Sequence, residues 1–541
     1  MNAPATVYEA FRATAAAHPD NAWLCVPARD GRDYAPEGVE LTYGDGLAAI
    51  DRLRQAYRSA GYGCGHRVAL MLDNRPDHFL HMWALNGLGV AVVPVNGDSM
   101  PHELAYIVDH SDVDLAIVLQ RHAQRMHAAA AGRARPLPIL VLGGEVAQPP
   151  VPERCAGDRA PARDGEAAII YTSGTTGRPK GCVIDNAFMF AVGDWYAGIG
   201  GRLTLERGRE RVFVPLPVFH VNVGTNTSTA LILTANCLIL PDRFHPDTWW
   251  RDVVATRATA IHYLGIMPPL LLKAPPCAEE RAHRVKFGLG AGIDPQLHVQ
   301  FERRFGIAMV EVWGMTETGR FFGDCHEPRR IDTRAFGRPG GGYLARVVDE
   351  QDREVPRGTA GELVVRWDGP DPRFGFFRGY LKDDPATAEA WRGDWFHTGD
   401  VVFQEEDGML HFVERRKNII RRSGENISAA EVENALVDHP AVAQVAVLAV
   451  PDALRDEEVM ACVVATDSAQ ANADLAEALV AHARGRLAYH KLPGWIVFVD
   501  TLPRTSTQKI QKGLIFAKGV DPCADARAHD MRALKRRQPP P

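Results

Sequence analysis

The 541-residue sequence lacks an apolar stretch long enough to cross a lipid bilayer. Its most apolar window, residues 230–240, is far shorter than the ~20 residues that a membrane-spanning helix requires. The first residues also lack the charged segment and the apolar core of a secretory signal. We therefore expect a soluble protein without stable membrane insertion, located in the cytoplasm.

Cysteine is scarce, and positive charge is not in excess. The nine cysteines form no CxxC pair and show no spacing with histidine that suits a metal, so neither a disulfide framework nor a zinc site is expected. A formal net charge of −6 gives no electrostatic reason to expect nucleic-acid binding, because such proteins carry a basic patch or stripe. The length exceeds what a single hydrophobic core supports, so at least two domains are expected.

Short apolar runs alternate with longer segments of helical period over roughly residues 40–315. The runs are residues 67–72, 90–95, 115–119, 138–142 and 212–216. This alternation is typical of parallel sheets that are covered by helices on both faces. The first half of the chain is therefore predicted to form doubly wound α/β sheets.

The pattern changes after residue 335, where short strands and Gly or Pro turns predict a small β-rich subdomain at about 335–415. We predict an α/β protein in which a large N-terminal domain, residues 1–415, includes this subdomain. A small, mobile α+β C-terminal domain is expected at 416–520. Residues 521–541 are polar and are expected to form a disordered tail.

A loop rich in glycine and hydroxyl side chains follows the apolar run at 167–170. It reads Tyr171-Thr-Ser-Gly-Thr-Thr-Gly-Arg-Pro-Lys-Gly181. Glycines let the backbone approach a phosphate, hydroxyls donate hydrogen bonds to it, and a lysine adds positive charge. A flexible surface loop is the simpler alternative, and a P-loop is disfavoured because Pro179 and Gly181 break its pattern. The candidate phosphate ligands are Thr172, Ser173, Gly174, Thr175, Thr176 and Lys180.

A second motif, Glu311-Val-Trp-Gly-Met-Thr-Glu-Thr318, follows the apolar run at 307–310. Polar groups at a buried strand end are suited to facing a ligand. Trp313 is expected to stack on a purine, Thr316 to donate to a phosphate, and Glu317 to hold a magnesium ion. A helix cap is the alternative for this motif taken alone.

Together these motifs resemble the adenylate-forming superfamily of acyl-CoA synthetases, peptide-synthetase adenylation domains and luciferases, and in particular its carnitine/crotonobetaine-CoA ligase-like branch. The resemblance covers about residues 170–515. It implies that Asp400, in Trp395-Phe-His-Thr-Gly-Asp400, and Arg415 bind the ribose, and that Gly290 and Ala291, with Glu311 nearby, belong to the nucleotide site.

The resemblance also assigns roles near the end of the chain and in the acid pocket. Lys509, in Pro503-Arg-Thr-Ser-Thr-Gln-Lys509, would reach the acyl phosphate, and Gly424 would belong to the segment that faces CoA. Lys417 falls on the family's hinge position. His220, in Pro217-Val-Phe-His220, would orient the acid's carboxylate, although such a histidine taken alone is more often packed core.

The sequence departs from the family pattern at three of these positions. Trp313 replaces the usual tyrosine, which keeps the stacking face but loses a hydroxyl. Glu414 and Asn418 stand where glycine and aspartate are usual. None of these changes removes a group whose charge the reaction needs.

The resemblance implies an ATP-dependent acyl-CoA synthetase, that is, an acid–thiol ligase. A carboxylic acid would form an acyl-adenylate with release of pyrophosphate, and CoA would then form the thioester. The implied cofactors are ATP, Mg²⁺ bound by Glu317, and CoA as cosubstrate. The residues expected to act in catalysis are Lys509, Glu317, Thr172 and His220.

Three alternatives stay open: a free-standing adenylation enzyme that loads a carrier protein, a non-catalytic ligand-binding paralogue, and a luciferase-like oxygenase. The partners expected are therefore a small carboxylic acid, ATP and CoA, and a homodimer is left open as the assembly. Gly314 is expected to leave the acid pocket open, and Val221, Asn222 and Gly288 to line it. The acid is therefore expected to be larger than acetate.

Overall fold

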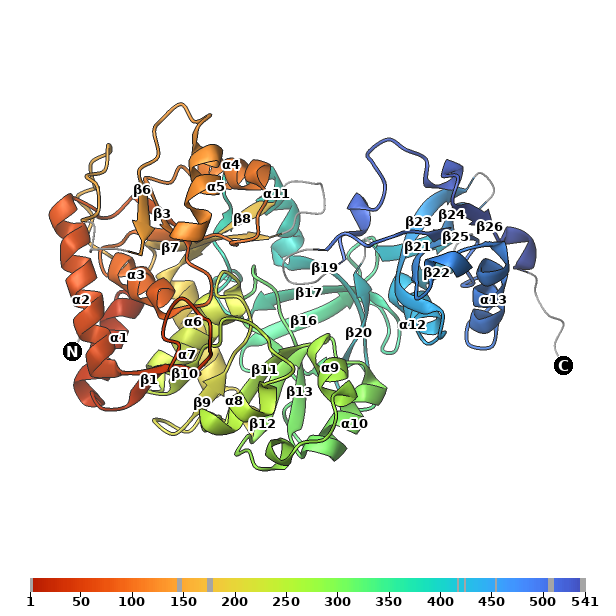
Figure 1. Cartoon of the computed structure of the whole chain (residues 1–541), viewed down its shortest axis with the longest axis horizontal. Helices are drawn as coiled ribbons and strands as arrows, with labels where there is room; N and C mark the ends of the chain where they lie inside the picture. The colour runs from red at the N-terminus through yellow and green to blue at the C-terminus, as the bar shows by residue number, and fades with distance from the viewer. Residues whose placement is uncertain are drawn as a thin grey trace. The chain divides into compact units, whose positions relative to one another are not determined.

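The computed structural model describes residues 3–143, 148–172, 179–415, 418–422, 425–452, 455–504 and 510–535 (Figure 1). The chain divides into two compact units. The large unit comprises Met1–Arg346, Val364–His397 and Glu405–His411, and the small unit comprises Val347–Leu363, Thr398–Gln404 and Phe412–Pro541. Each unit is described by itself.

The first sheet of the large unit has eight strands in the order β14-β13-β12-β11-β9-β10-β1-β2. Its inner strands from β13 to β1 run parallel, while β2 and β14 are antiparallel edge strands. The bounds are β1 Ala22–Val26, β2 Val39–Thr42, β9 Arg211–Phe213, β10 Cys237–Ile239, β11 Ala260–Leu264, β12 Phe287–Ala291, β13 Ala308–Trp313 and β14 Phe322–Gly323.

The second sheet has seven strands in the order β18-β8-β7-β4-β3-β5-β6. Its strands from β7 to β6 run parallel, and β8 and β18 add antiparallel pairs at one edge. The bounds are β3 Arg67–Met71, β4 Ala91–Pro94, β5 Leu115–Leu119, β6 Ile139–Leu142, β7 Glu166–Thr172, β8 Lys180–Asp185 and β18 Gly379–Tyr380. Because both faces are covered, strands such as β4 and β5 are buried along their whole length.

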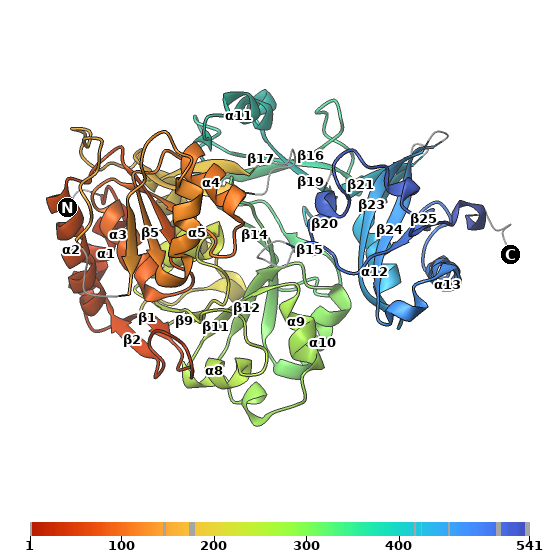
Figure 2. The same ribbon diagram turned by 45° about the horizontal axis from the view of Figure 1, so that its top comes forward.

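Helices cover the two sheets of the large unit. They are α1 Val7–Ala17, α2 Tyr43–Ala60, α3 Pro76–Asn86, α4 Pro101–His110, α5 Gln120–Ala130, α6 Asn186–Gly198, α7 Ser228–Leu233, α8 Trp249–Ala255, α9 Met267–Lys273, α10 Pro295–Phe305 and α11 Asp384–Ala390. Figure 2 shows α4 and α5 side by side next to β5, and their apolar residues share one core with that strand. A π-helical segment, η2 Asn222–Thr227, precedes α7.

These observations confirm the predicted α/β class and its doubly wound sheets. Each of the five apolar runs named above overlaps a strand of this unit. Alternation of apolar runs with helical segments was sufficient to predict them, because a strand buried on both faces must be apolar on both.

A third, five-stranded sheet follows the order β15-β20-β19-β17-β16, and the division into two units falls within several of its strands. The bounds are β15 Ala335–Gly337, β16 Tyr343–Val348, β17 Gly361–Trp367, β19 Phe396–Gln404 and β20 Leu410–Arg415. A β-rich segment was expected here. The small unit, however, also takes in residues 347–363 and 398–404. The domain boundaries given above stay predictions.

The fourth sheet belongs to the small unit and runs β22-β21-β24-β25-β26, with β23 also paired to β24. Helices α12 Ala429–Val437 and α13 Ala473–Arg484 bury their apolar faces against it. The strand bounds are β21 Ile419–Arg422, β22 Glu425–Ser428, β23 Val442–Asp452, β24 Asp456–Ala465, β25 Trp495–Phe498 and β26 Ala528–Asp530.

The expectation of a disordered tail is wrong for residues 521–535. Strand β26 pairs antiparallel with β25. Beyond it, the ammonium of Lys535, whose side chain is 1% exposed, forms an ion pair with the fully buried Glu458. The same carboxylate accepts hydrogen bonds from Arg422 Nε at 2.9 and 2.8 Å. This segment therefore completes the sheet and supplies a charge that its buried interior requires.

In the parts of the chain that the structure describes, no helix is both long enough and apolar enough to span a membrane.

Candidate active site

The phosphate-loop motif joins the antiparallel strands β7 and β8. Thr172 and Lys180 are register partners at the ends of these strands, so the two ends of the loop lie side by side. The hydroxyl of Tyr106 donates to the carbonyl of Pro179 at 3.1 Å, and His110 Nδ1 lies 2.8 Å from the Tyr171 hydroxyl. Helix α4 therefore holds both ends of the loop.

Six site residues predicted from the sequence, and the predicted hinge residue, lie outside the described residues. They are Ser173, Gly174, Thr175, Thr176, Gly424, Lys509 and Lys417.

Tyr380 links the phosphate loop to the second motif. Its ring lies 4.7 Å from Lys180 Nζ, a cation–π contact, and its hydroxyl donates to Glu317 Oε1 at 2.9 Å. Strand β18 brings Tyr380 there by pairing with β8, and the amide of Phe377 donates to the carbonyl of Glu317 at 2.9 Å. Lys180 and Glu317, far apart in sequence, are thereby brought together, and no sequence motif indicated the residue that joins them.

Burial raises the pKa of the Tyr380 phenol, and the neighbouring Glu317 carboxylate raises it further. The phenol therefore keeps its proton and remains a hydrogen-bond donor to Glu317. An ionised carboxylate with a fixed donor on one oxygen is an oriented ligand of the kind that Mg²⁺ accepts. Among the described residues, no group of three or more His, Cys, Asp or Glu side chains is placed to hold a metal ion.

Glu311 begins the same motif, but its carboxylate has partners within the protein. It accepts hydrogen bonds from the hydroxyl of Tyr263 at 3.0 Å, from the amide of Ile293 at 3.4 Å, and from the amide of Gly292. Burial raises the pKa of Glu311 to about 7. This carboxylate therefore fixes the turn after β12, and the structure favours a supporting role over direct contact with a nucleotide.

The end of β12 carries Gly290 and Ala291. A Cβ on Gly290 would lie 2.3 Å from the carbonyl oxygen of Tyr263 and 2.5 Å from its ring, so only glycine fits there. Ala291 is exposed at the strand end. Tyr263 thus fixes the position of this turn, and the contact of Gly290 and Ala291 with the nucleotide stays a prediction.

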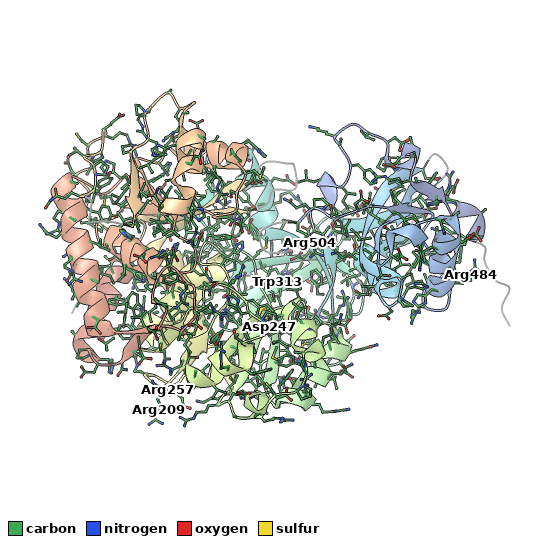
Figure 3. The ribbon with its side chains drawn as sticks, in the orientation of Figure 1. Arg209, Asp247, Arg257, Trp313, Arg484 and Arg504 are labelled. Carbon is green, nitrogen blue, oxygen red and sulfur yellow. The ribbon has the colours of Figure 1, made fainter. Side chains whose placement is uncertain are left out.

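Trp313, labelled in Figure 3, ends β13 and is only 6% exposed. Its ring stacks on Phe322 with centroids 5.5 Å apart and planes inclined by 20°. The expected stacking of Trp313 on a purine stays a prediction. Thr316, on the following loop, is half-buried.

Asp400 and Arg415 form an ion pair within the small unit. Arg415 Nε lies 2.6 Å from Asp400 Oδ1, with side chains 34% and 1% exposed. The backbone around Asp400 is fixed, because the hydroxyl of Thr398 donates to Leu363 O at 2.7 Å and the amide of Gly399 donates to Glu362 at 3.0 Å. The two residues predicted to bind the ribose therefore lie together on β19 and β20.

The two sequence departures next to Arg415 contact each other. Asn418 Nδ2 donates to Glu414 Oε1 at 3.2 Å. The other oxygen of Glu414 accepts from the amide of Ala430 at 2.9 Å and from the hydroxyl of Ser428 at 3.3 Å, at the first turn of α12. Glu414 and Asn418 therefore form one structural unit that ties β20 to a helix N-terminus, which favours a carboxylate.

The loop that carries His220 is held by Asn74, a buried residue that no sequence motif indicated. Asn74 donates to the carbonyls of Leu216 and Pro241 at 2.9 and 3.2 Å and accepts from the amide of Val218 at 2.9 Å. His220 Nε2 is buried and has no hydrogen-bond partner among the described residues. Burial lowers the pKa of His220 to about 4, so the ring is neutral at ordinary pH.

Two expectations about the acid pocket are corrected. Gly288 shares a sheet face with Ile261 and Met309, and a Cβ on it would lie 2.4 Å from Met309 Sδ. Asn222 instead contacts His262, which follows Ile261 and therefore points to the opposite face. Gly288 thus does not line one cavity with Asn222.

The space beside Gly314 is narrower than expected. Gly314 is exposed, but a Cβ on it would lie 3.1 Å from Phe321 Cβ and 3.3 Å from the carbonyl oxygen of Arg320. A large side chain at this position, such as tryptophan, would require Phe321 and the Arg320 carbonyl to shift before it could be accommodated.

The segment that leads to Lys509 is anchored at both ends within the small unit. Arg504 and Ile510 form an isolated β-bridge, and Arg504 donates to Gln444 Oε1 at 2.9 Å. Lys512 Nζ lies 2.8 Å from Glu433 Oε1. The described residues on either side of Lys509, Arg504 and Ile510, are therefore fixed within the small unit.

The sequence profile of the AMP-binding enzyme family matches residues 11–381, and the profile of the AMP-binding enzyme C-terminal domain matches residues 431–509. The chain is 29% identical over 504 residues to the sulfoacetate–CoA ligase of Cupriavidus necator, covering 92% of this chain and 95% of that protein. It is also 29% identical to the crotonobetaine/carnitine–CoA ligase of Proteus mirabilis, covering 87% and 92% of the two chains.

Solved structures share the fold. The benzoate CoA ligase from Burkholderia xenovorans LB400 gives a TM-score of 0.78 at 23% identity, covering 94% of this chain and 99% of that one. The o-succinylbenzoate CoA synthetase from Bacillus subtilis, in complex with its acyl-adenylate intermediate, gives 0.78 at 20% identity, covering 96% and 99%.

Proposed function

The chain belongs to the AMP-binding enzyme family, and from this premise we propose that it is an ATP-dependent acyl-CoA synthetase. It is an acid–thiol ligase that makes an acyl-adenylate and then a CoA thioester. The observation that carries the proposal is the joining of Lys180, at one end of the phosphate loop, to Glu317 of the second motif through Tyr380.

The first half-reaction joins two anions. A carboxylate oxygen of the acid attacks the α-phosphorus of ATP, the bond to the bridging oxygen breaks, and pyrophosphate leaves with the electron pair. The developing charge has to be met by preorganised donors and cations. In this proposal Thr172, Ser173, Gly174, Thr175 and Thr176 donate to the phosphates, and Lys180 adds positive charge.

Further roles follow from the described contacts and from the sequence pattern. Glu317, oriented by Tyr380, would hold Mg²⁺, which would supply charge neutralisation at the phosphates. Thr316 would donate to a phosphate. Asp400 and Arg415, already paired, would bind the ribose, and Gly290, Ala291 and Trp313 would contact the base, with Glu311 fixing the turn beneath it.

The second half-reaction uses the small unit. Lys509, also on the small unit, serves the first half-reaction, adenylate formation. The segment that contains Gly424 faces CoA in the second half-reaction, thioester formation. The thiol sulfur attacks the acyl carbonyl, and AMP leaves with the electron pair of the broken C–O bond. The mobility of the C-terminal domain about Lys417 is part of this proposal.

His220 is the residue that contacts the carboxylate of the acid in this proposal. A neutral imidazole orients the carboxylate through a hydrogen bond without pairing its charge, which keeps that oxygen nucleophilic. The acid is larger than acetate, and small polar acids of the kinds for which the two curated relatives are named belong among the candidates. A homodimer and a cytoplasmic location remain predictions.

The test is a panel of carboxylic acids measured for pyrophosphate exchange and for AMP release, each with and without CoA. We expect exchange without CoA, and AMP together with a thioester only when CoA is added. Exchange with an acid but no thioester at any CoA concentration would favour the carrier-protein alternative. If no acid in the panel gives exchange while ATP still binds, the chain is a ligand-binding paralogue.

A further inference from the structure

A chain of hydrogen bonds runs through the interior of the large unit from α6 to the start of η2. The hydroxyl of Tyr196 lies 3.0 Å from His262 Nε2, and His262 Nδ1 lies 3.0 Å from Asn222 Oδ1. The hydroxyl of Thr227 also donates to Asn222 Oδ1, at 3.3 Å. Asn222 lies two residues after His220, at the first position of the π-helical segment. Segments of this kind are frequent at functional sites.

The donor and the acceptor in each of these hydrogen bonds follow from a count of the groups available. Tyr196 is fully buried, and His262 is the only acceptor that the described residues offer to its hydroxyl. The phenol proton therefore points to Nε2, because a buried donor without an acceptor is costly. A neutral imidazole that accepts at Nε2 carries its proton on Nδ1, so His262 donates to Asn222 Oδ1.

The protonation state of His262 agrees with this direction. Burial lowers the pKa of His262 to about 3, so the ring stays neutral. With Oδ1 accepting from both His262 and Thr227, the amide NH₂ of Asn222 is directed away from them. Asn222 is half-buried, like Val221 and His220 beside it, and its NH₂ has no partner among the described residues.

We propose that Asn222 is a specificity-determining residue whose NH₂ donates to an oxygen acceptor on the acyl chain of the acid. Tyr196 and His262 are positioning residues that hold the amide in this orientation. The acid is thereby defined by class as a carboxylic acid that carries an ether, carbonyl, hydroxyl or similar oxygen beyond its carboxylate. The inference rests on the proposed function, because it presupposes that His220 and Asn222 face the acid.

The experiment compares pairs of acids that differ in one acceptor. Methoxyacetate is matched to butanoate and levulinate to pentanoate, and β-alanine serves as a probe that presents a donor. For each acid kcat/KM is measured by pyrophosphate exchange in wild type, Asn222→Leu, Tyr196→Phe and the surface control Gln55→Leu. Melting temperatures and ATP binding show that each variant is folded.

Wild type should favour the acceptor acid of at least one pair by about 10-fold, the size expected for one well-placed hydrogen bond. Asn222→Leu should reduce this ratio to about 1, because the loss of kcat/KM falls on the acceptor acid. Tyr196→Phe should reduce the ratio in part, because His262 can then carry its proton on either nitrogen. Gln55→Leu should leave every ratio unchanged.

Three outcomes would overturn the inference and leave the proposed function standing. A wild-type ratio near 1 in both pairs would show that no acceptor is read, and a preference for β-alanine would show that the amide faces the other way. An equal loss for plain and acceptor acids in Asn222→Leu would place Asn222 on the shared carboxylate. If no acid at all supports exchange, the proposed function fails and the inference fails with it.

Discussion

Two groups of residues in the large unit, here called the nucleotide wall and the acid wall, differ in the charges that their side chains carry. The nucleotide wall, here Thr172, Lys180, Glu317 and Tyr380, combines a cation and a carboxylate around one phenol. The acid wall, here Tyr196, His220, Asn222 and His262, has two histidines that burial keeps neutral and an amide. The difference corresponds to what each wall is proposed to meet.

A triphosphate has to be neutralised before another anion can attack it, so charges on the nucleotide wall assist the reaction. The attacking carboxylate, by contrast, should not be paired with a cation. A strong ion pair would stabilise it in the ground state and lower its nucleophilicity. A neutral acid wall orients the nucleophile and leaves its charge available. Four predictions test this division, beginning with the largest expected effect.

Lys509→Ala should nearly abolish adenylate formation, because this lysine is proposed to add the charge that the nucleotide wall lacks at the acyl phosphate. The expected loss is roughly 10²–10³-fold in kcat, or about 3–4 kcal/mol. Thioester formation from a supplied acyl-adenylate should be spared, and Lys518→Ala, at an exposed position on the same unit, should behave like wild type. An equal loss in both half-reactions would contradict this assignment.

Glu311 begins the motif that contains Glu317, and the stability that it contributes should decrease as the pH rises. Its pKa is raised to about 7 in the folded protein, against 4.5 ordinarily. Between these values the folded state binds more protons, so the free energy of unfolding falls as pH rises through this range and is constant above it. From pH 5.5 to 8 this loss should be roughly 2 kcal/mol.

Urea unfolding of wild type and Glu311→Gln at several pH values measures this effect. The variant cannot titrate at residue 311, so the difference in unfolding free energy between the two proteins should change with pH and level off above about pH 7. Parallel curves would show that Glu311 is ionised in the folded state at every pH tested.

Tyr380→Phe removes one hydroxyl from the nucleotide wall and keeps the ring beneath Lys180. Glu317 then loses the donor that orients it, and a hydrogen bond to a charged group contributes about 1.5 kcal/mol. We expect kcat/KM for pyrophosphate exchange to fall about 10-fold and the Mg²⁺ concentration for half-maximal rate to rise. Tyr489→Phe, at a surface position, is the matched control. An unchanged Mg²⁺ dependence would mean that Tyr380 only packs.

The smallest effect concerns chain length on the acid wall. Each methylene that is buried should add up to about 0.8 kcal/mol, so kcat/KM should rise up to about fourfold per carbon from acetate upward. The rise should stop where the chain reaches a polar group such as Asn222. A decrease in kcat/KM from acetate to propanoate would show that the pocket is closed. Phe321, which lies close to Gly314, would then be the residue that closes it.

Much of the fold follows from local sequence patterns. Runs such as residues 68–72 and 115–119 are apolar on both faces, and that pattern predicts buried parallel strands without knowledge of their partners. The strand at 528–530 has no such pattern. It is ordered through β25 and through the ion pair of Lys535 with Glu458, contacts that join residues distant in sequence.

The candidate site divides in the same way. The glycine-rich loop and the second motif are contiguous, so the sequence indicated Lys180 and Glu317 separately. Tyr380 and Asn74 were missed because each acts on segments far from it in sequence. Glu414 and Asn418 appeared as two independent departures, and only their 3.2 Å contact shows that the two side chains interact.

The hydrogen-bond chain through His262 has an evolutionary consequence. The orientation of Asn222 is set by a tyrosine on α6 that is fully buried and lies behind the histidine. Loss of one oxygen atom, in a mutation from tyrosine to phenylalanine, would free the amide to present its carbonyl in place of its NH₂. A pocket built in this way can come to prefer a donor over an acceptor through a change at a residue that never meets the substrate.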